Sequence, residues 1–199
     1  MDSSVAARTS TPPPASGPTA RLRRLYYLRF AFAAAWAGLL LASAHTLNPL
    51  SATLLVVYPL FDVGCAVADA RSARAERGPV RGLRVNIALS SLACAGLVAA
   101  AASGIPAVLR VWGAWAVTAG LVQLAVGVQR RGMPGQWPMI ASGAISVLAG
   151  ASFAAQAGRA DATLGSLAGY AFLGGVFFLL SALRLGRAGN TRPAQGDTP

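Results

Sequence analysis

The stretch PLSATLLVVYPLFDVGCAVADA, residues 49–70, is long and apolar enough to cross the hydrocarbon core of a bilayer. Such a crossing takes about 20 apolar residues in a helix. Two carboxylates, Asp62 and Asp69, interrupt the run. Ionisable residues inside a membrane span are rare, and they usually face a partner in the protein interior or a water-filled cavity. The stretch therefore predicts a membrane-spanning helix whose two carboxylates need an explanation.

The whole chain has the composition of a membrane protein. Of its 199 residues, 55% are hydrophobic and 12% are charged, whereas an average soluble domain carries about 25% charged residues. Six apolar segments approach the length of a membrane span, and they cover approximately residues 25–44, 48–70, 83–103, 106–128, 137–157 and 163–185. Because short connections make consecutive spans antiparallel, we predict an all-α integral membrane protein with six transmembrane helices, arranged as three tandem hairpins (25–70, 83–128 and 137–185).

The segments that flank this membrane domain, residues 25–185, are expected to be cytoplasmic tails. Residues 1–24 are rich in Ser, Thr, Pro and Ala at their start and are predicted to be disordered, and residues 186–199 form a second tail. Fifteen of the 17 arginines fall on the side of the predicted membrane that carries both termini. Since positive residues accumulate in cytoplasmic loops, both termini are expected in the cytoplasm. Cleavage of the first span as a secretory signal, after residues 42–44, is the open alternative.

Glycines mark an internal repeat of about 55 residues. They align the odd-numbered spans with one another, and also the even-numbered spans, at Gly38, Gly96, Gly150 and at Gly64, Gly120, Gly175. Small residues let membrane helices approach closely, so these six glycines are predicted to lie at helix–helix contacts. The bundle is accordingly expected to be compact, with little room for a wide aqueous pore.

The repeat resembles a known family. An odd-numbered helix with a Gly-aliphatic run before a proline, followed by an even-numbered helix with an aromatic-x-x-x-small-Gly pattern, is similar to the HdeD-like family of bacterial membrane proteins. The resemblance is clearest over WPMIASGAISVLAGASF (137–153) and YAFLGGVFFLLSALR (170–184), although the third hairpin lacks the proline. It implies six spans in the bacterial inner membrane and a part in resistance to acid stress, and it implies no established catalytic residues.

The two aspartates are expected to have different roles. Helical rise places Asp69 and Arg29 at similar depths near the cytoplasmic boundary, which predicts an ion pair between them. Asp62 lies about 13 Å inside the membrane by the same rise, where a charge costs about 2.5–3.5 kcal/mol. Either Asp62 is protonated and donates to a hydroxyl or to a backbone carbonyl, such as that of Leu55, which Pro59 leaves free, or it binds a proton or a solute.

Enzymatic function is not expected. The chain has one histidine, no GxSxG motif and no Gly-rich phosphate loop, so we predict no catalytic residues, no metal and no cofactor. Its arginines fall between apolar runs, which argues against a nucleic-acid partner. The expected partners are the lipid bilayer, a second copy of the chain or another membrane protein. The sequence thus favours a non-catalytic structural or acid-stress-related membrane component, and the alternative is a small transporter or channel for protons or a small solute that uses Asp62.

Overall fold

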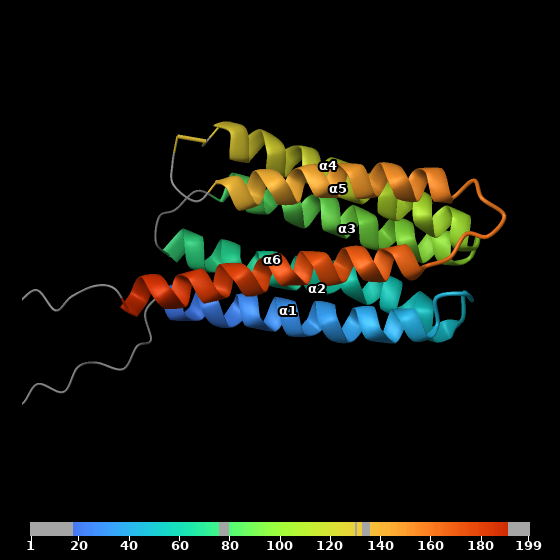
Figure 1. Cartoon of the computed structure of the whole chain (residues 1–199), viewed down its shortest axis with the longest axis horizontal. Coiled ribbons are helices and arrows are strands. Elements are labelled where there is room, and N and C mark those ends of the chain that lie inside the picture. The colour runs from blue at the N-terminus through green and yellow to red at the C-terminus, as the bar shows by residue number, and fades with distance from the viewer. Residues whose placement is uncertain (1–17, 76–79, 130, 133–135, 191–199) are drawn as a thin grey trace, which may run out of the picture.

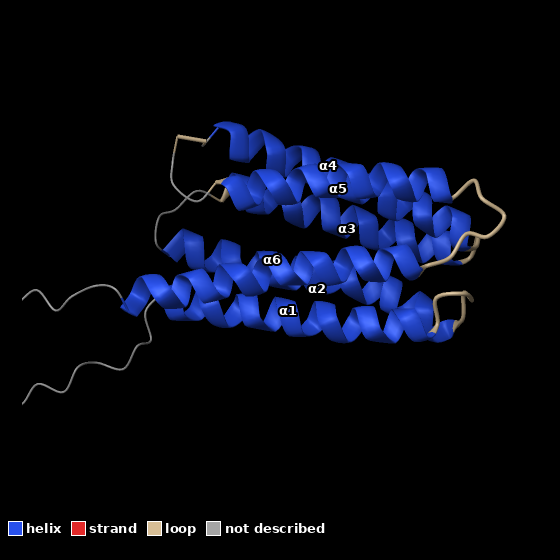
Figure 2. Ribbon diagram, viewed as in Figure 1, coloured by secondary structure: helices blue, strands red, loops and turns tan. Residues whose placement is uncertain are grey.

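The described residues form a bundle of α-helices. The structure is a computed structural model that describes residues 18–75, 80–129, 131–132 and 136–190. Within these residues there are six helices and no strand (Figure 2), namely α1 (Pro18–Ala42), α2 (Pro49–Ala75), α3 (Arg81–Ala101), α4 (Ile105–Gln129), α5 (Trp137–Gln156) and α6 (Gly165–Asn190). All six are long and apolar enough to cross a membrane. The predicted fold class is therefore confirmed, and the chain is an all-α multi-pass membrane protein.

The first and last helices extend beyond the predicted membrane domain. The helix α1 begins at Pro18 rather than at residue 25, and α6 ends at Asn190 rather than at residue 185. Proline fits the first turn of a helix, where its missing N–H needs no partner. Arginines near the ends of membrane helices can extend their charged groups to the headgroups while their stems stay on the helix. Residues 18–24 and 186–190 of the predicted tails are therefore helical, and residues 1–17 and 191–199 lie outside the described residues.

The six helices run side by side and form a closed ring. The start of α1 and the end of α6 lie at one end of the bundle, here called the terminal end, and the connections 43–48, 102–104 and 157–164 lie at the other, the loop end (Figure 1). Each helix contacts the next along the chain, and α6 closes the ring on α1. At the loop end, the backbone N–H of Leu164 donates to the carbonyl of Ala44 over 2.9 Å, which ties two of the connections together.

Packing is uneven around this ring. The most extensively packed pairs are α4 with α5, α1 with α6 and α2 with α3, whereas α1 touches α2, and α5 touches α6, at few positions. The order of the helices fits three tandem hairpins. In all three hairpins, however, each helix packs mainly against a helix of another hairpin, so the hairpins are not compact packing units.

Facing glycines explain the close packing of α4 on α5. A Cβ added to Gly120 would lie 2.7 Å from the carbonyl oxygen of Gly143, and one added to Gly150 would lie 2.6 Å from that of Gly113. A side chain at either position would collide with backbone, so the two helices would have to move apart. Close backbone approach of this kind is how helices associate where lipid provides no hydrophobic drive.

The other four aligned glycines fall into two groups. A Cβ on Gly175 would lie 2.9 Å from the Cβ of Ala33 in α1, and one on Gly96 would lie 3.0 Å from a methyl group of Val111 in α4. Gly38 and Gly64 have no such neighbour within 4 Å. The packing prediction is therefore wrong for those two glycines, because alignment in the predicted repeat does not ensure that each glycine faces a neighbouring helix.

A tightly packed core fills the loop-end half of the bundle. Its centre is an aromatic cluster of Trp36, Tyr58, Trp112 and Trp115, in which the ring centroids of Trp36 and Trp112 are 5.4 Å apart and those of Trp112 and Trp115 are 5.3 Å apart. The indole N–H of Trp36 donates to the carbonyl of Leu54 over 2.7 Å. Such aromatic contacts and a satisfied indole stabilise a buried core. This core closes the loop end of the ring.

Candidate functional site

The terminal-end half of the ring encloses a cavity of about 800 Å³. All six helices line it, and each contributes a polar or charged side chain, in chain order Tyr26, Asp62, Asn86, Gln123, Ser146 and Arg184. Leu22 and Leu185 line it near the terminal end, and Tyr58 and Trp115 of the aromatic cluster line it where the packed core begins. The bundle is thus less compact than the small residues predict, because the helices converge at the loop end and leave space at the other.

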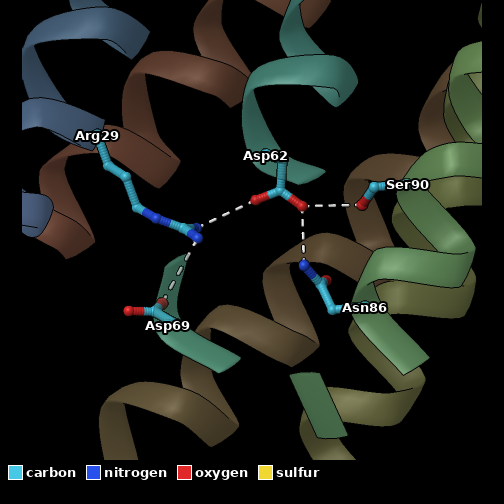
Figure 3. Close-up of polar contacts among 5 residues, drawn as sticks. All are labelled: Arg29, Asp62, Asp69, Asn86 and Ser90. Carbon is cyan, nitrogen blue, oxygen red and sulfur yellow. Dashed lines mark hydrogen bonds and ion pairs between the residues drawn. The ribbon is translucent and has the colours of Figure 1, made fainter. Parts of the chain in front are cut away.

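Asp62 is the best-connected polar side chain in the wall of this cavity (Figure 3). Its Oδ1 accepts a hydrogen bond from Arg29 Nη1 at 3.1 Å, and its Oδ2 accepts from Asn86 Nδ2 and Ser90 Oγ, both at 2.8 Å. The Nη2 atom of Arg29 lies 3.7 Å from Asp69 Oδ2. We call Arg29, Asp62 and Asp69 the ion cluster. Its Asp62 oxygens face only donors, which is the arrangement that suits a carboxylate.

Three neighbouring helices build this ion cluster. Asp62 and Asp69 are seven residues apart on α2, so they lie on nearly the same face. Arg29 comes from α1, and Asn86 and Ser90, four residues apart, come from one face of α3. The side chains of Arg29, Asp62 and Asp69 are 10%, 21% and 20% exposed. With both carboxylates ionised, one shared guanidinium leaves the cluster with one net negative charge.

The position of Arg29 accounts for both aspartates. The contact between Arg29 and Asp69 is present, but the shorter contact is with Asp62. Helical rise alone places the backbone of Arg29 at a shallower depth than that of Asp62. The arginine side chain is long enough to span this difference, so its guanidinium reaches Asp62. The structure does not show Asp62 as a donor to a carbonyl among the described residues. Instead, near Pro59, the carbonyl of Val56 accepts a contact from Cys94 Sγ at 3.9 Å.

Asn86 and Ser90 are the site residues that the sequence analysis missed. The sequence does contain a signal for them, because they are two polar side chains four residues apart, and so on one helical face, within a predicted span. Thr118, which the repeat aligns with Asp62, is exposed and donates to the carbonyl of Ala114 in its own helix at 2.8 Å. The position that the predicted repeat aligns with Asp62 therefore takes no part in a similar cluster in the second hairpin.

The cavity also contains polar groups suited to hold a bound molecule. Tyr170 donates to Ser146 Oγ at 2.9 Å across the gap between α6 and α5. The indole N–H of Trp115 is buried and has no hydrogen-bond partner among the described residues. In the same part of the chain, no group of three or more His, Cys, Asp or Glu side chains is placed to hold a metal ion. The cavity wall can therefore contact a bound molecule through a carboxylate, several neutral hydrogen-bond donors and acceptors, and aromatic rings.

Fold and site together define a six-helix membrane protein with a cavity beside a partly buried ion cluster. No protein-family model, no curated protein and no solved structure matches this chain. The resemblance to HdeD-like proteins accordingly rests on the motifs quoted above.

Proposed function

We propose that this chain is a solute-binding membrane protein of the HdeD-like type that holds a small molecule in its central cavity beside Asp62, without catalysing a reaction. The observation that carries this proposal is the cavity itself, which reaches from the terminal end to Asp62 and stops at the aromatic cluster. The arginine distribution supports an orientation in which the terminal end faces the cytoplasm of a bacterial cell. In that orientation the solute enters from the cytoplasm.

A purely structural role explains this architecture less well. Protein interiors are normally close-packed, so a bundle that served only as a scaffold would not need a cavity of about 800 Å³. Well-packed apolar residues often stabilise a protein as much as a buried ion pair does. Ionisable groups retained inside a membrane bundle are therefore more typical of a binding or transport pathway.

Transport is the activity that best uses such a site. A transporter exposes its binding site to one side of the membrane at a time, and its site lies near the middle of the bilayer. Asp62 lies near the middle of α2, and the packed loop end would have to open to complete a cycle. The second candidate is a non-catalytic structural or acid-stress-related component that contacts lipid, a second copy of itself or another membrane protein. The close glycine packing of α4 on α5 favours that candidate, because it favours a rigid bundle.

Water access to the cavity gives the first test. Cys65 and Cys94 are replaced by alanine, and a single cysteine is introduced as Ser142→Cys, at a position that lines the cavity. A membrane-impermeant thiol reagent applied to the cytoplasmic face of inverted vesicles is expected to label it. The control is Leu148→Cys on the same helix, 71% exposed on the bundle surface and covered by lipid in this proposal. Failure to label Ser142→Cys in folded protein would contradict solute access.

Proton movement gives the second test. Purified protein in liposomes loaded with a pH-sensitive dye is exposed to an external acid step, alongside the Asp62→Asn variant and empty liposomes. Proton flux above that of empty liposomes, lost in Asp62→Asn, is the result expected of a transporter that uses Asp62 to carry protons. Equal flux in all three samples would rule out proton transport and favour the structural candidate if Ser142→Cys is also unlabelled.

A further inference from the structure

We infer that the ligand of the central cavity is a small organic cation with an aromatic or aliphatic body, bound with its charge at Asp62 and its body against the aromatic side chains of the wall. This inference rests on the proposed solute-binding function and names the class of solute. Three separate observations carry it: the charge that the cavity presents, the aromatic lining, and the way Arg29 is held.

The cavity presents the negative member of the ion cluster. Among the described residues, Asp62 lines the cavity, whereas Arg29 and Asp69 do not. A molecule in the cavity therefore meets a carboxylate first, with the guanidinium behind it. Because the cluster as a whole carries one net negative charge in a poorly solvated setting, it attracts a cation more strongly than the same charge would in water.

The other charged group that lines the described cavity is Arg184. It lies in the part of α6 near the terminal end and is exposed. Solvent and salt screen an exposed charge, and its influence falls off over about 10 Å at ordinary ionic strength. Asp62 lies deeper than Arg184, because its partner Arg29 packs on Phe178, six residues and about 9 Å before Arg184 along α6. The binding part of the cavity is consequently the negative part.

Aromatic side chains line the cavity around Asp62. They come from four helices and are Tyr26, Tyr58, Trp115, Tyr170, Phe177 and Phe178. The negative faces of such rings attract cations, and aromatic cages are a common means of binding quaternary ammonium groups. One ring of this wall already holds a cation, because the guanidinium carbon of Arg29 lies 4.9 Å from the centroid of the Phe178 ring. The wall is thus suited to the body and to the charge of an organic cation.

One carboxylate oxygen of Asp62 can change its hydrogen-bond partner without loss of the contacts to the other oxygen. Asn86 and Ser90 both hold Oδ2, while Arg29 alone holds Oδ1 among the described residues. An incoming cation can take the place of Arg29 at Oδ1 while Arg29 stays with Asp69, to which it is already 3.7 Å away. Each carboxylate then has one cation, so binding neutralises the cluster. An anion at the same place would add repulsion and gain no partner.

Two probes of equal shape and opposite charge test the inference. Tetraphenylphosphonium and tetraphenylborate both offer aromatic bodies, and their binding to the full-length protein in detergent is measured by equilibrium dialysis. The cation is expected to bind at least about tenfold more tightly than the anion. Asp62→Asn is expected to weaken binding of the cation by about tenfold or more, with little effect on the anion. Size-exclusion chromatography and circular dichroism establish that each variant is folded.

A second variant keeps the test decisive if Asp62→Asn fails to fold. Ala119 lines the cavity on α4 and makes no part of the ion cluster, so Ala119→Trp fills the space without changing the charge. It is expected to reduce binding of the phosphonium cation by about tenfold. Equal binding in wild type and Ala119→Trp would place the probe outside the cavity and overturn the inference.

The outcomes separate this inference from the function on which it rests. Tighter binding of tetraphenylborate, or equal binding of both probes, would overturn the cation class. Binding of neither probe by protein in which Ser142→Cys is labelled would also overturn it, and the solute-accessible cavity would stand. Binding of neither probe together with an unlabelled Ser142→Cys would contradict both.

Discussion

Replacement of Arg29 by methionine is expected to destabilise the protein more than any other single change in the ion cluster. Arg29 is the shared partner of Asp62 and Asp69, and its side chain is 10% exposed. Methionine keeps much of the side-chain length and volume but has no charge. The variant therefore leaves two carboxylates in the bundle interior without a cation, and both contacts are lost at once.

The magnitude follows from the two contact distances. At an effective dielectric constant of about 20, unit charges at these separations of 3.1 and 3.7 Å attract by about 5 and about 4.5 kcal/mol. Much of this attraction offsets the cost of removing the guanidinium from water, and loss of one partner from a buried pair typically costs about 3–5 kcal/mol. Since both carboxylates retain about one-fifth exposure, we expect a loss near the lower limit, about 3 kcal/mol.

The measurement is the free energy of unfolding in lipid bicelles, obtained by titration with sodium dodecyl sulfate and followed by far-ultraviolet circular dichroism. The matched control is Arg29→Met combined with Asp62→Asn and Asp69→Asn, which removes every charge of the cluster. That triple variant is expected to recover about 2 kcal/mol or more, because no unpaired charge remains. A loss below about 1 kcal/mol, or the same loss with and without the carboxylates, would refute the reasoning.

Three further predictions concern packing, a buried hydrogen bond and an exposed ion pair. Gly120→Ala is expected to cost about 1–3 kcal/mol in the same unfolding assay, because its Cβ would meet a backbone carbonyl. Gly38→Ala meets nothing within 4 Å and is expected to stabilise the protein by about 0.5–1 kcal/mol. Equal effects of the two substitutions would contradict the assigned packing. Trp36→Phe removes an indole hydrogen bond of 2.7 Å and is expected to cost about 1 kcal/mol in that assay, so an unchanged stability would count against this bond. In the connection 157–164, the hydrogen bond from Arg159 lowers the pKa of Asp161 below its ordinary value of 3.8, so the pair favours the folded connection above that pH and loses its effect as the pH falls through the lowered pKa. A carboxyl titration followed by nuclear magnetic resonance should show the low pKa and its rise in Arg159→Gln, and an ordinary pKa in the wild type would contradict the contact.

Hydropathy was sufficient to predict the six helices but not their neighbours. A run of about 20 apolar residues is recognisable in the sequence as a membrane helix, because a segment inside the hydrocarbon core must be apolar and must satisfy its own backbone hydrogen bonds. Which helix lies beside which is harder to predict, since lipid and protein interior are equally apolar and hydropathy does not distinguish the two faces of a span. The contact of Arg29 with α2 could be predicted because a short connection joins those helices. The same argument applies to α2 and α3, but Asn86 and Ser90 are neutral and cost far less in a span than a charge does, so hydropathy does not single them out.

The glycines show a second limit of the sequence. The alignment selected one glycine per helix by its place in the repeat, and it included Gly120 and Gly150. Gly113 and Gly143, which lie opposite them, are each seven residues from their helical companion. Seven residues are nearly two turns, so each helix carries two glycines on one face. Periodicity within a helix therefore predicts the α4–α5 contact better than similarity between helices does.

The two connections at the loop end determine how the bundle can move. The pair α1 and α6 is joined to the other helices through the connections 43–48 and 157–164, and the hydrogen bond between Leu164 and Ala44 holds these connections together. Both boundaries of this pair, toward α2 and toward α5, are the sparsely packed ones. We therefore expect α1 and α6 to rotate together, as one rigid unit, about the connections at the loop end. A small rotation there produces its largest displacement at the terminal end, where the cavity opens.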